Sequence, residues 1–140
     1  MSELKKKIQA KMTTPQLSAL ATITEDGKPW VRYVTPVMDH NLTVWMATFA
    51  GSRKVAHIKK NPEVHLTTGV TCMETAESYL QIQGRAEVLT DAATKKEVWS
   101  DHLKRIFTGS DDPNYNVVKI TPYRIEYQGM DMVPPEVWEA

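Results

Sequence analysis

The sequence has a single cysteine, no excess charge of either sign and no long apolar run. Cys72 alone cannot form an internal disulfide framework, which fits a reducing compartment. The 17 basic and 17 acidic residues cancel, so no general attraction to nucleic acid or to an anionic membrane is expected. No segment approaches the ~20 apolar residues of a membrane span, and residues 1–12 lack the apolar core of a secretory signal. We therefore expect a soluble, cytoplasmic protein.

The chain also lacks the residue patterns of common catalytic and metal sites. Its 140 residues suffice for one domain with its own core, so residues 1–140 are expected to form a single domain. The histidines and Cys72 are not spaced as metal ligands, and neither a Ser-His-Asp arrangement nor a catalytic pair of carboxylates is present. No catalytic side chain is identified. His57 is interpreted as a surface histidine, with assistance to a nearby phosphate as the alternative, and Trp30 is interpreted as a core residue.

Alternation of apolar and polar residues predicts a largely β structure. It indicates strands over residues 17–24, 30–38, 42–48, 63–70, 78–89, 117–120 and 123–128. Asp26-Gly27 predicts a hairpin turn, Pro36 an edge position or bulge, and Gly84 a bend in the longest strand. Helices are expected over residues 3–12, from Arg53 to Asn61-Pro62, and over residues 91–107. This pattern favours a small, mainly β (α+β) antiparallel barrel with helices packed outside it.

The segment from Trp45 to Pro62 has an unusual charge order. A strand ends there, Gly51 is expected to let the backbone turn, and Ser52 stands where an N-cap hydroxyl belongs. Arg53 and Lys54 follow as the first helical residues, although a helix N-terminus favours acidic neighbours. Free N–H groups, a hydroxyl, a guanidinium and an ammonium together suit a phosphate. The alternative is a solvated basic turn.

Three strings of the sequence carry a resemblance to a known family. They are LATITEDGKPWVRYVTPVM, LTVWMATFAGSRKVAHIKKNPEVHL and YLQIQGRAEVL. In this order they resemble the pyridoxamine 5′-phosphate oxidase-like split-barrel superfamily, and most closely its short FMN-binding branch, the general stress proteins. The resemblance covers roughly residues 17–128. It implies a six- to seven-stranded antiparallel split β-barrel with flanking helices, FMN as cofactor, and a homodimer with its flavin sites at the interface.

The resemblance also implies roles for individual residues. The Arg53-Lys54 pair would hold the flavin phosphate, and the strand from Arg32 to Pro36 would lie along the isoalloxazine ring. Thr48 would contact phosphate or ribityl, and Tyr79 would reach the flavin from the partner subunit. The expected cofactor-binding residues are Arg32, Tyr33, Val34, Thr35, Thr48, Ser52, Arg53, Lys54, Tyr79 and Gln81.

Two departures from the family pattern bear on activity. The family's oxidases carry a lysine near the end of the flavin strand, where this chain has Val37. The chain is also too short for the C-terminal segment that binds pyridoxal phosphate in those enzymes. Pyridoxamine oxidation is therefore not implied.

Three functions follow as hypotheses. The first is a flavin-dependent oxidoreductase that exchanges electrons with a small-molecule donor or acceptor. The second is a flavin-binding sensor or reservoir without turnover. The third keeps the fold but binds a deazaflavin or haem, although no histidine is clearly placed as an axial ligand. Trp138, in a terminal tail, is expected to cover a partner's flavin or to close the dimer.

Overall fold

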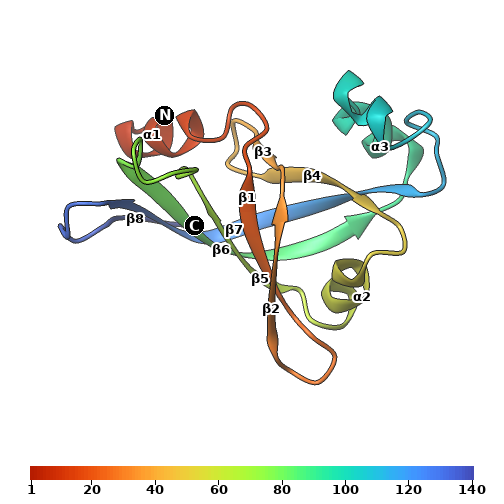
Figure 1. Cartoon of the computed structure of the whole chain (residues 1–140), viewed down its shortest axis with the longest axis horizontal. Coiled ribbons are helices and arrows are strands. Elements are labelled where there is room, and N and C mark those ends of the chain that lie inside the picture. Colours follow the sequence, from red (N-terminus) through yellow and green to blue (C-terminus); the bar gives the residue numbers. More distant parts are fainter.

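The computed structural model of the chain describes residues 1–140 as three α-helices, one 3-10 helix and eight strands (Figure 1). None of the helices has the length and apolar character needed to cross a membrane. In chain order the elements are α1 (Glu3–Ala10), β1 (Ser18–Ile23), β2 (Pro29–Val34), β3 (Val37–Met38), β4 (Val44–Phe49), α2 (Arg53–Lys60), β5 (Glu63–Thr68), β6 (Ser78–Leu89), α3 (Ala92–Val98), η1 (Asp101–Arg105), β7 (Tyr115–Gly129) and β8 (Glu136–Glu139).

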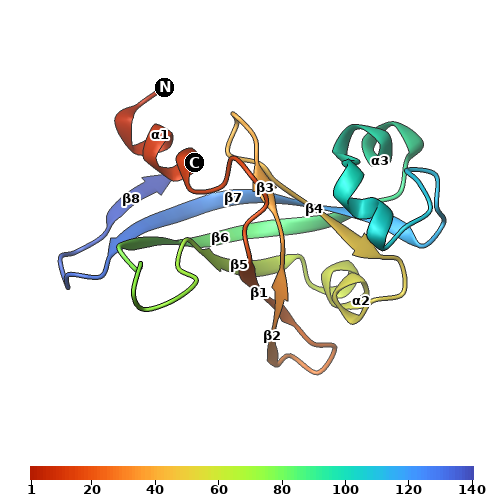
Figure 2. The same ribbon diagram turned by 45° about the horizontal axis from the view of Figure 1, so that its top comes forward.

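All eight strands belong to one antiparallel sheet that does not close. The strand order is β2-β1-β5-β6-β7-β4-β3, and β8 pairs with β7 beside this path. The long strands β6 and β7 run side by side across the molecule, and α1, α2 and α3 lie at its periphery (Figures 1 and 2). This arrangement confirms the expected mainly β split barrel with flanking helices. It leaves β2 as an edge strand, as Pro36 had indicated for this part of the chain.

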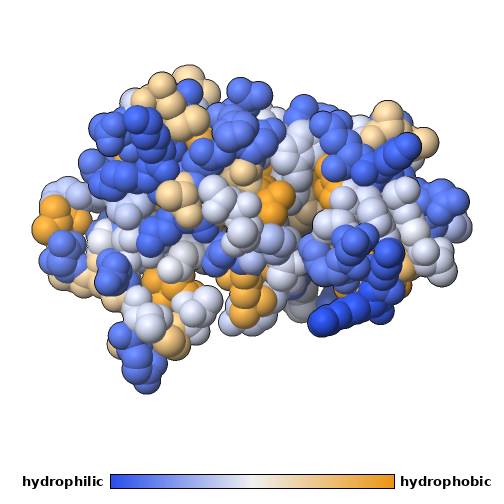
Figure 3. Space-filling model, turned by 90° about the horizontal axis from the view of Figure 1, so that it is seen from above, coloured by the Kyte–Doolittle hydropathy of each residue, from blue (hydrophilic) through white to orange (hydrophobic).

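Alternating side chains of the sheet form the core. In β1, β5 and β6 every second residue is buried, the period expected of strands with one covered face. A second, smaller cluster packs under α3 and η1 and consists of Leu103, Phe107, Tyr115 and Val117. On the face seen from above, hydrophilic residues predominate and apolar residues form small separate groups (Figure 3).

Two prolines affect the strands differently from the prediction. The strand expected over residues 30–38 is divided into β2 and β3, with Thr35 and Pro36 between them. By contrast, the strands expected over residues 117–120 and 123–128 are one strand, β7, which passes through Pro122. Pro122 lies opposite Gly84, beside a register shift between Gln83 and Gly84. A bulge interrupts the ladder at this point, so the missing proline N–H does not end the strand.

The C-terminal half holds two further corrections. The helix expected over residues 91–107 begins as predicted, with the Asp91 side chain accepting from the Thr94 N–H, but α3 ends at Val98 and η1 follows. The tail after Pro135 forms β8, which the sequence did not predict. Trp138 there lies opposite Ile125 of β7 and packs against the main core. Trp138 is thus partly buried by its own chain, and its expected contact with a partner subunit stays a prediction.

Gly84 is required by close packing at the bulge. A Cβ there would lie 2.8 Å from Ile120 Cγ2 and 2.9 Å from the Thr121 carbonyl oxygen. We predict that Gly84→Ala lowers the free energy of unfolding by roughly 1–3 kcal/mol, as overpacking does. Gly51→Ala is the control, because a Cβ there meets nothing within 4 Å. Urea denaturation of both apo-variants tests this, and equal stabilities would contradict it.

Candidate functional site

The start of α2 is fixed in space by the packing of the helix. Val55 and Ile58 are buried, and α2 lies against β1 and β6. Ser52 occupies the N-cap position with extended backbone angles, as predicted. Gly51 has no positive φ, so the turn from β4 into α2 does not depend on a glycine there. The first residues of α2 are therefore presented at the end of β4 by a rigid connection.

Two hydroxyls and an ammonium meet at this connection. Lys54 Nζ donates to Thr48 Oγ1 at 2.9 Å, and it lies 3.4 Å from Ser52 Oγ. Ser52 Oγ is also 3.0 Å from Thr48 Oγ1. The Ser52 hydroxyl makes no capping bond, contrary to the prediction. The N–H of Val55 donates to the Ser52 carbonyl oxygen at 3.1 Å, whereas the N–H groups of Arg53 and Lys54 have no partner and stay available to a ligand.

Arg32 and Arg53 bring two more positive charges to this site. The Arg53 guanidinium lies 5.1 Å from the centre of the Trp30 ring. Arg32 is half-buried, and burial lowers its pKa, with a further lowering by the charge of Arg53. Burial also lowers the pKa of Lys54, and the charge of Arg32 adds to the effect. Arg32 is thus close enough to both Arg53 and Lys54 for its charge to repel theirs.

No ion pair joins Arg32, Arg53 or Lys54 to a carboxylate. Other close charges in the chain are paired, for example Arg124 with Glu126 and Glu139. Arg53 is exposed, but Arg32 and Lys54 are partly buried, and such charges without a counter-ion are costly unless an anion joins them. We call Arg32, Thr48, Ser52, Arg53 and Lys54 the cationic cluster. Its chemistry suits a phosphate monoester, which accepts several charge-assisted hydrogen bonds.

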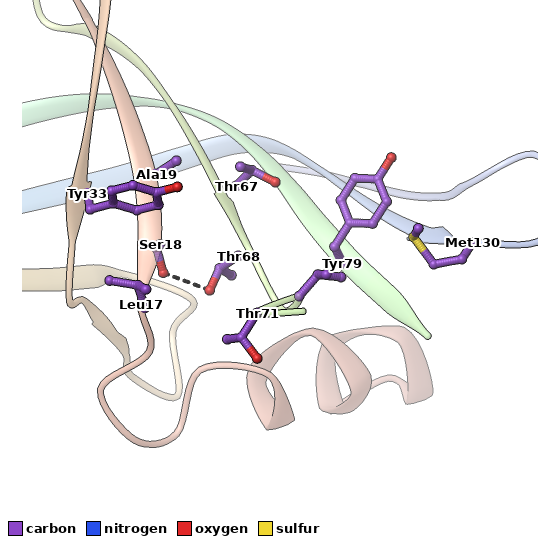
Figure 4. Close-up of a pocket in the computed structure, with 10 residues that line it drawn as sticks. Leu17, Ser18, Ala19, Tyr33, Thr67, Thr68, Thr71, Tyr79 and Met130 are labelled. Atoms are coloured by element: carbon purple, nitrogen blue, oxygen red, sulfur yellow. Dashed lines mark hydrogen bonds between the residues drawn. The ribbon is translucent and has the colours of Figure 1, made fainter. Parts of the chain in front are cut away.

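Other residues expected at the site lie on the opposite face of the sheet. Arg32 is opposite Leu20 and Tyr33 is opposite Ala19, so the side chains of Arg32 and Tyr33 point to different faces. Tyr33 is 76% exposed and lines a cavity of about 470 Å³ together with Tyr79 (Figure 4). A hydrogen bond of 2.7 Å between Ser18 and Thr68 crosses the floor of this cavity (Figure 4). Tyr33 and Tyr79 therefore share a surface that is separate from the cationic cluster.

The remaining predicted residues take three positions. Gln81 lies on the outer face in a polar group with His65, Gln83, Arg124 and Glu126. Val34 is half-buried and packs against the main core. Thr35 is exposed and lines a cavity of about 240 Å³ with Val37 and Trp45. One chain thus gathers the predicted phosphate residues and leaves Tyr33, Tyr79 and Gln81 apart from them.

The structure adds three residues that the sequence did not assign to the site. His57 is only 8% exposed, which corrects its interpretation as a surface histidine. Its Nδ1 lies 2.8 Å from the hydroxyl of Thr22, which is fully buried. Trp30 is 45% exposed and faces Arg53, so it is not a core residue. The position of His57 on the inner face of α2, between Val55 and Ile58, was the signal that could have revealed its burial.

No group of three or more His, Cys, Asp or Glu side chains is placed to hold a metal ion. Cys72 is exposed in the loop between β5 and β6, and its Sγ lies 3.2 Å from Thr75 Oγ1.

Comparison with known proteins gives consistent matches over most of the chain. The family described as "Pyridoxamine 5'-phosphate oxidase" matches residues 4–129. General stress protein 26 of Bacillus subtilis (strain 168) is 33% identical over 120 residues, which are 86% of this chain and 84% of that protein. The crystal structure of the General Stress Protein 26 from Bacillus anthracis str. Sterne superposes with a TM-score of 0.82 at 29% identity, covering 99% of this chain and 100% of that one.

The same fold occurs in more distant proteins with other names. An "F420 Reductase" matches with a TM-score of 0.67 at 19% identity, covering 84% of this chain and 94% of that chain. A heme binding protein from Mycobacterium smegmatis matches with a TM-score of 0.76 at 16% identity, covering 98% of this chain and 57% of that one. These two likenesses concern the fold alone. The family match and the Bacillus subtilis relative, by contrast, cover most of the domain in sequence, and the chain belongs to the pyridoxamine 5′-phosphate oxidase family.

Proposed function

We propose that the protein binds FMN, with the phosphate at the cationic cluster. The observation that carries this proposal is the meeting of three cations at a helix start without a carboxylate. A phosphate monoester carries up to two negative charges near neutral pH and three acceptor oxygens. It would relieve the repulsion among Arg32, Arg53 and Lys54 and accept from the N–H groups at the start of α2.

The ring of the flavin is proposed to lie along the free edge of β2. This strand pairs only with β1, so its outward N–H and C=O groups have no partner strand. Backbone groups from Arg32 to Thr35 can then hydrogen-bond the heteroatoms of the ring. Such fixed dipoles stabilise the charge that develops when a flavin is reduced.

A second copy of the chain is proposed to complete the site. Val31 and Tyr33 on β2 are 64% and 76% exposed, which is unusual for apolar residues on an edge strand. Tyr79 and Gln81 face outward on the same side of the sheet as Tyr33. In a dimer that pairs these faces, Tyr79 and Gln81 of one subunit would approach the flavin held by the other.

The redox role is proposed to belong to the cofactor. When bound, FMN supplies electron-transfer chemistry, and the chain binds and orients it. The protein would exchange electrons with a small-molecule donor or acceptor. It is proposed to act in the cytoplasm, where an exposed Cys72 stays reduced. The alternatives are a flavin sensor or reservoir, and a deazaflavin or haem in the same fold.

Arg53→Ala should weaken FMN binding by roughly tenfold or more and leave riboflavin binding unchanged, because charge-assisted hydrogen bonds contribute about 1.5–3 kcal/mol. Fluorescence titration of the apo-protein with each flavin measures both affinities. Lys59→Ala is the control, since Lys59 is exposed on the same helix, away from its start. Equal affinity of the parent protein for FMN and riboflavin would refute the phosphate assignment.

Val31→Arg should dissociate the dimer by placing a charge at the β2 edge. Sedimentation at low micromolar concentration should give about twice 15.9 kDa for the parent and 15.9 kDa for the variant. Ile106→Arg is the control, because Ile106 is 54% exposed just after η1, next to α3 and apart from β2, and the variant should remain a dimer. A parent protein that is monomeric and still holds flavin would contradict the dimeric site.

Turnover separates an oxidoreductase from a sensor. We expect NADH or NADPH to reduce the bound flavin and a soluble acceptor to reoxidise it. The rates of both reactions in His40→Ala, His65→Ala and Cys72→Ser should stay within a few-fold of those of the parent protein. Stopped-flow absorbance with saturating FMN follows each half-reaction. Reduction lost in one of these variants while flavin stays bound would show that a side chain carries the chemistry. Absence of reduction in the parent would favour the sensor or reservoir.

A further inference from the structure

We infer that Thr22 and His57 are positioning residues that hold the Arg32 guanidinium toward the anion at the start of α2. This inference rests on the proposed phosphate site and goes beyond it, since neither Thr22 nor His57 is expected to touch the cofactor. The two residues come from different elements, β1 and α2, and meet at Arg32 on the edge strand β2.

The guanidinium of Arg32 is held by acceptors on two sides. Its Nη1 donates to Thr22 Oγ1 at 2.7 Å, and it also lies within hydrogen-bond distance of the Leu20 and Trp30 carbonyl oxygens, at 3.2 and 3.3 Å. Its Nη2 lies 3.4 Å from His57 Nδ1. These contacts fix the plane of the guanidinium. No contact engages Nε, which remains free to donate to a ligand.

The direction of the hydrogen bonds follows from the chemistry of the groups. A guanidinium can only donate, so both the Thr22 hydroxyl oxygen and His57 Nδ1 act as acceptors toward Arg32. Because Nδ1 then carries a lone pair, the Thr22 hydroxyl is the donor in its 2.8 Å contact with His57 Nδ1. The chain of donation runs from Arg32 to Thr22 to His57, and every buried polar side-chain atom in it has a partner.

None of the anchors of Arg32 is a carboxylate, and this matters for anion binding. A carboxylate at the same place would hold the guanidinium equally well, but it would cancel the positive charge and compete with a phosphate. Thr22, His57 and two backbone carbonyls instead fix the geometry and leave the charge uncompensated. Pre-ordering the side chain in this way avoids the entropy cost of immobilising an arginine when the ligand binds.

Two matched pairs of variants test this role. Thr22→Val removes the hydroxyl with little change of shape, and Thr22→Ser restores it. His57→Leu removes the acceptor, and His57→Asn places an amide oxygen near the position of Nδ1. The readout is the ratio of the riboflavin and FMN dissociation constants of each apo-protein, which reports the phosphate contribution. We expect Thr22→Val and His57→Leu to reduce this ratio by roughly three- to tenfold, and Thr22→Ser and His57→Asn to keep it within about twofold of the parent.

A double-mutant cycle separates positioning from a general structural role. In the Arg32→Leu background, Thr22→Val should change the ratio no further, because the side chain that it orients is gone. An unchanged ratio in Thr22→Val and His57→Leu, beside a reduced ratio in Arg32→Leu, would overturn the positioning role and leave the phosphate site intact. A parent ratio of one would overturn both. If the Thr22 variants do not fold, the His57 variants still test the inference, and the reverse also holds, because Thr22 lies on β1 and His57 on α2.

Discussion

Repulsion among three cations at the start of α2 is the constraint on which the site depends. Arg32, Arg53 and Lys54 are brought together by β2 and α2, and no carboxylate compensates them. A helix start already carries partial positive charge, so this arrangement lowers the stability of the protein without a ligand. The burial of Val55 and Ile58 on the inner face of α2 keeps the charges in place. Folding energy from the core is thus used to hold together positive charges that no carboxylate compensates.

The open sheet determines which other surfaces can lie near the cationic cluster. Because β2 is an edge strand, its backbone is free on one side and its side chains alternate between two faces. Arg32 takes the face of the cationic cluster, whereas Tyr33 takes the face that Tyr79 also lines. A single chain therefore holds the cationic cluster and, separately, an apolar and aromatic surface. In the proposed cofactor site, a second subunit would bring such a surface to the cationic cluster of the first.

The sequence predicted what depends on short-range pattern. Alternation located most strands, and the order of Ser52, Arg53 and Lys54 after β4 indicated an anion site. The hydrogen-bond partner of Ser52 was not predictable in this way, because Thr48 competes with the helix backbone for that hydroxyl. Strand β8 and the contacts of His57 were missed, since these depend on pairing and packing between distant segments. The continuity of β7 through Pro122 likewise depends on the bulge at Gly84 of the neighbouring strand.

The phosphorus-31 NMR spectrum of FMN bound to the protein tests the central claim most directly. A free phosphate monoester loses its second proton with a pKa of about 6. Three cations and a helix start favour the dianion and should lower that pKa, so the bound resonance should stay at its dianion position from about pH 8 down to about pH 5.5. A bound resonance that shifts with pH as free FMN does would show that the phosphate lies in solvent and that the cationic cluster does not hold it.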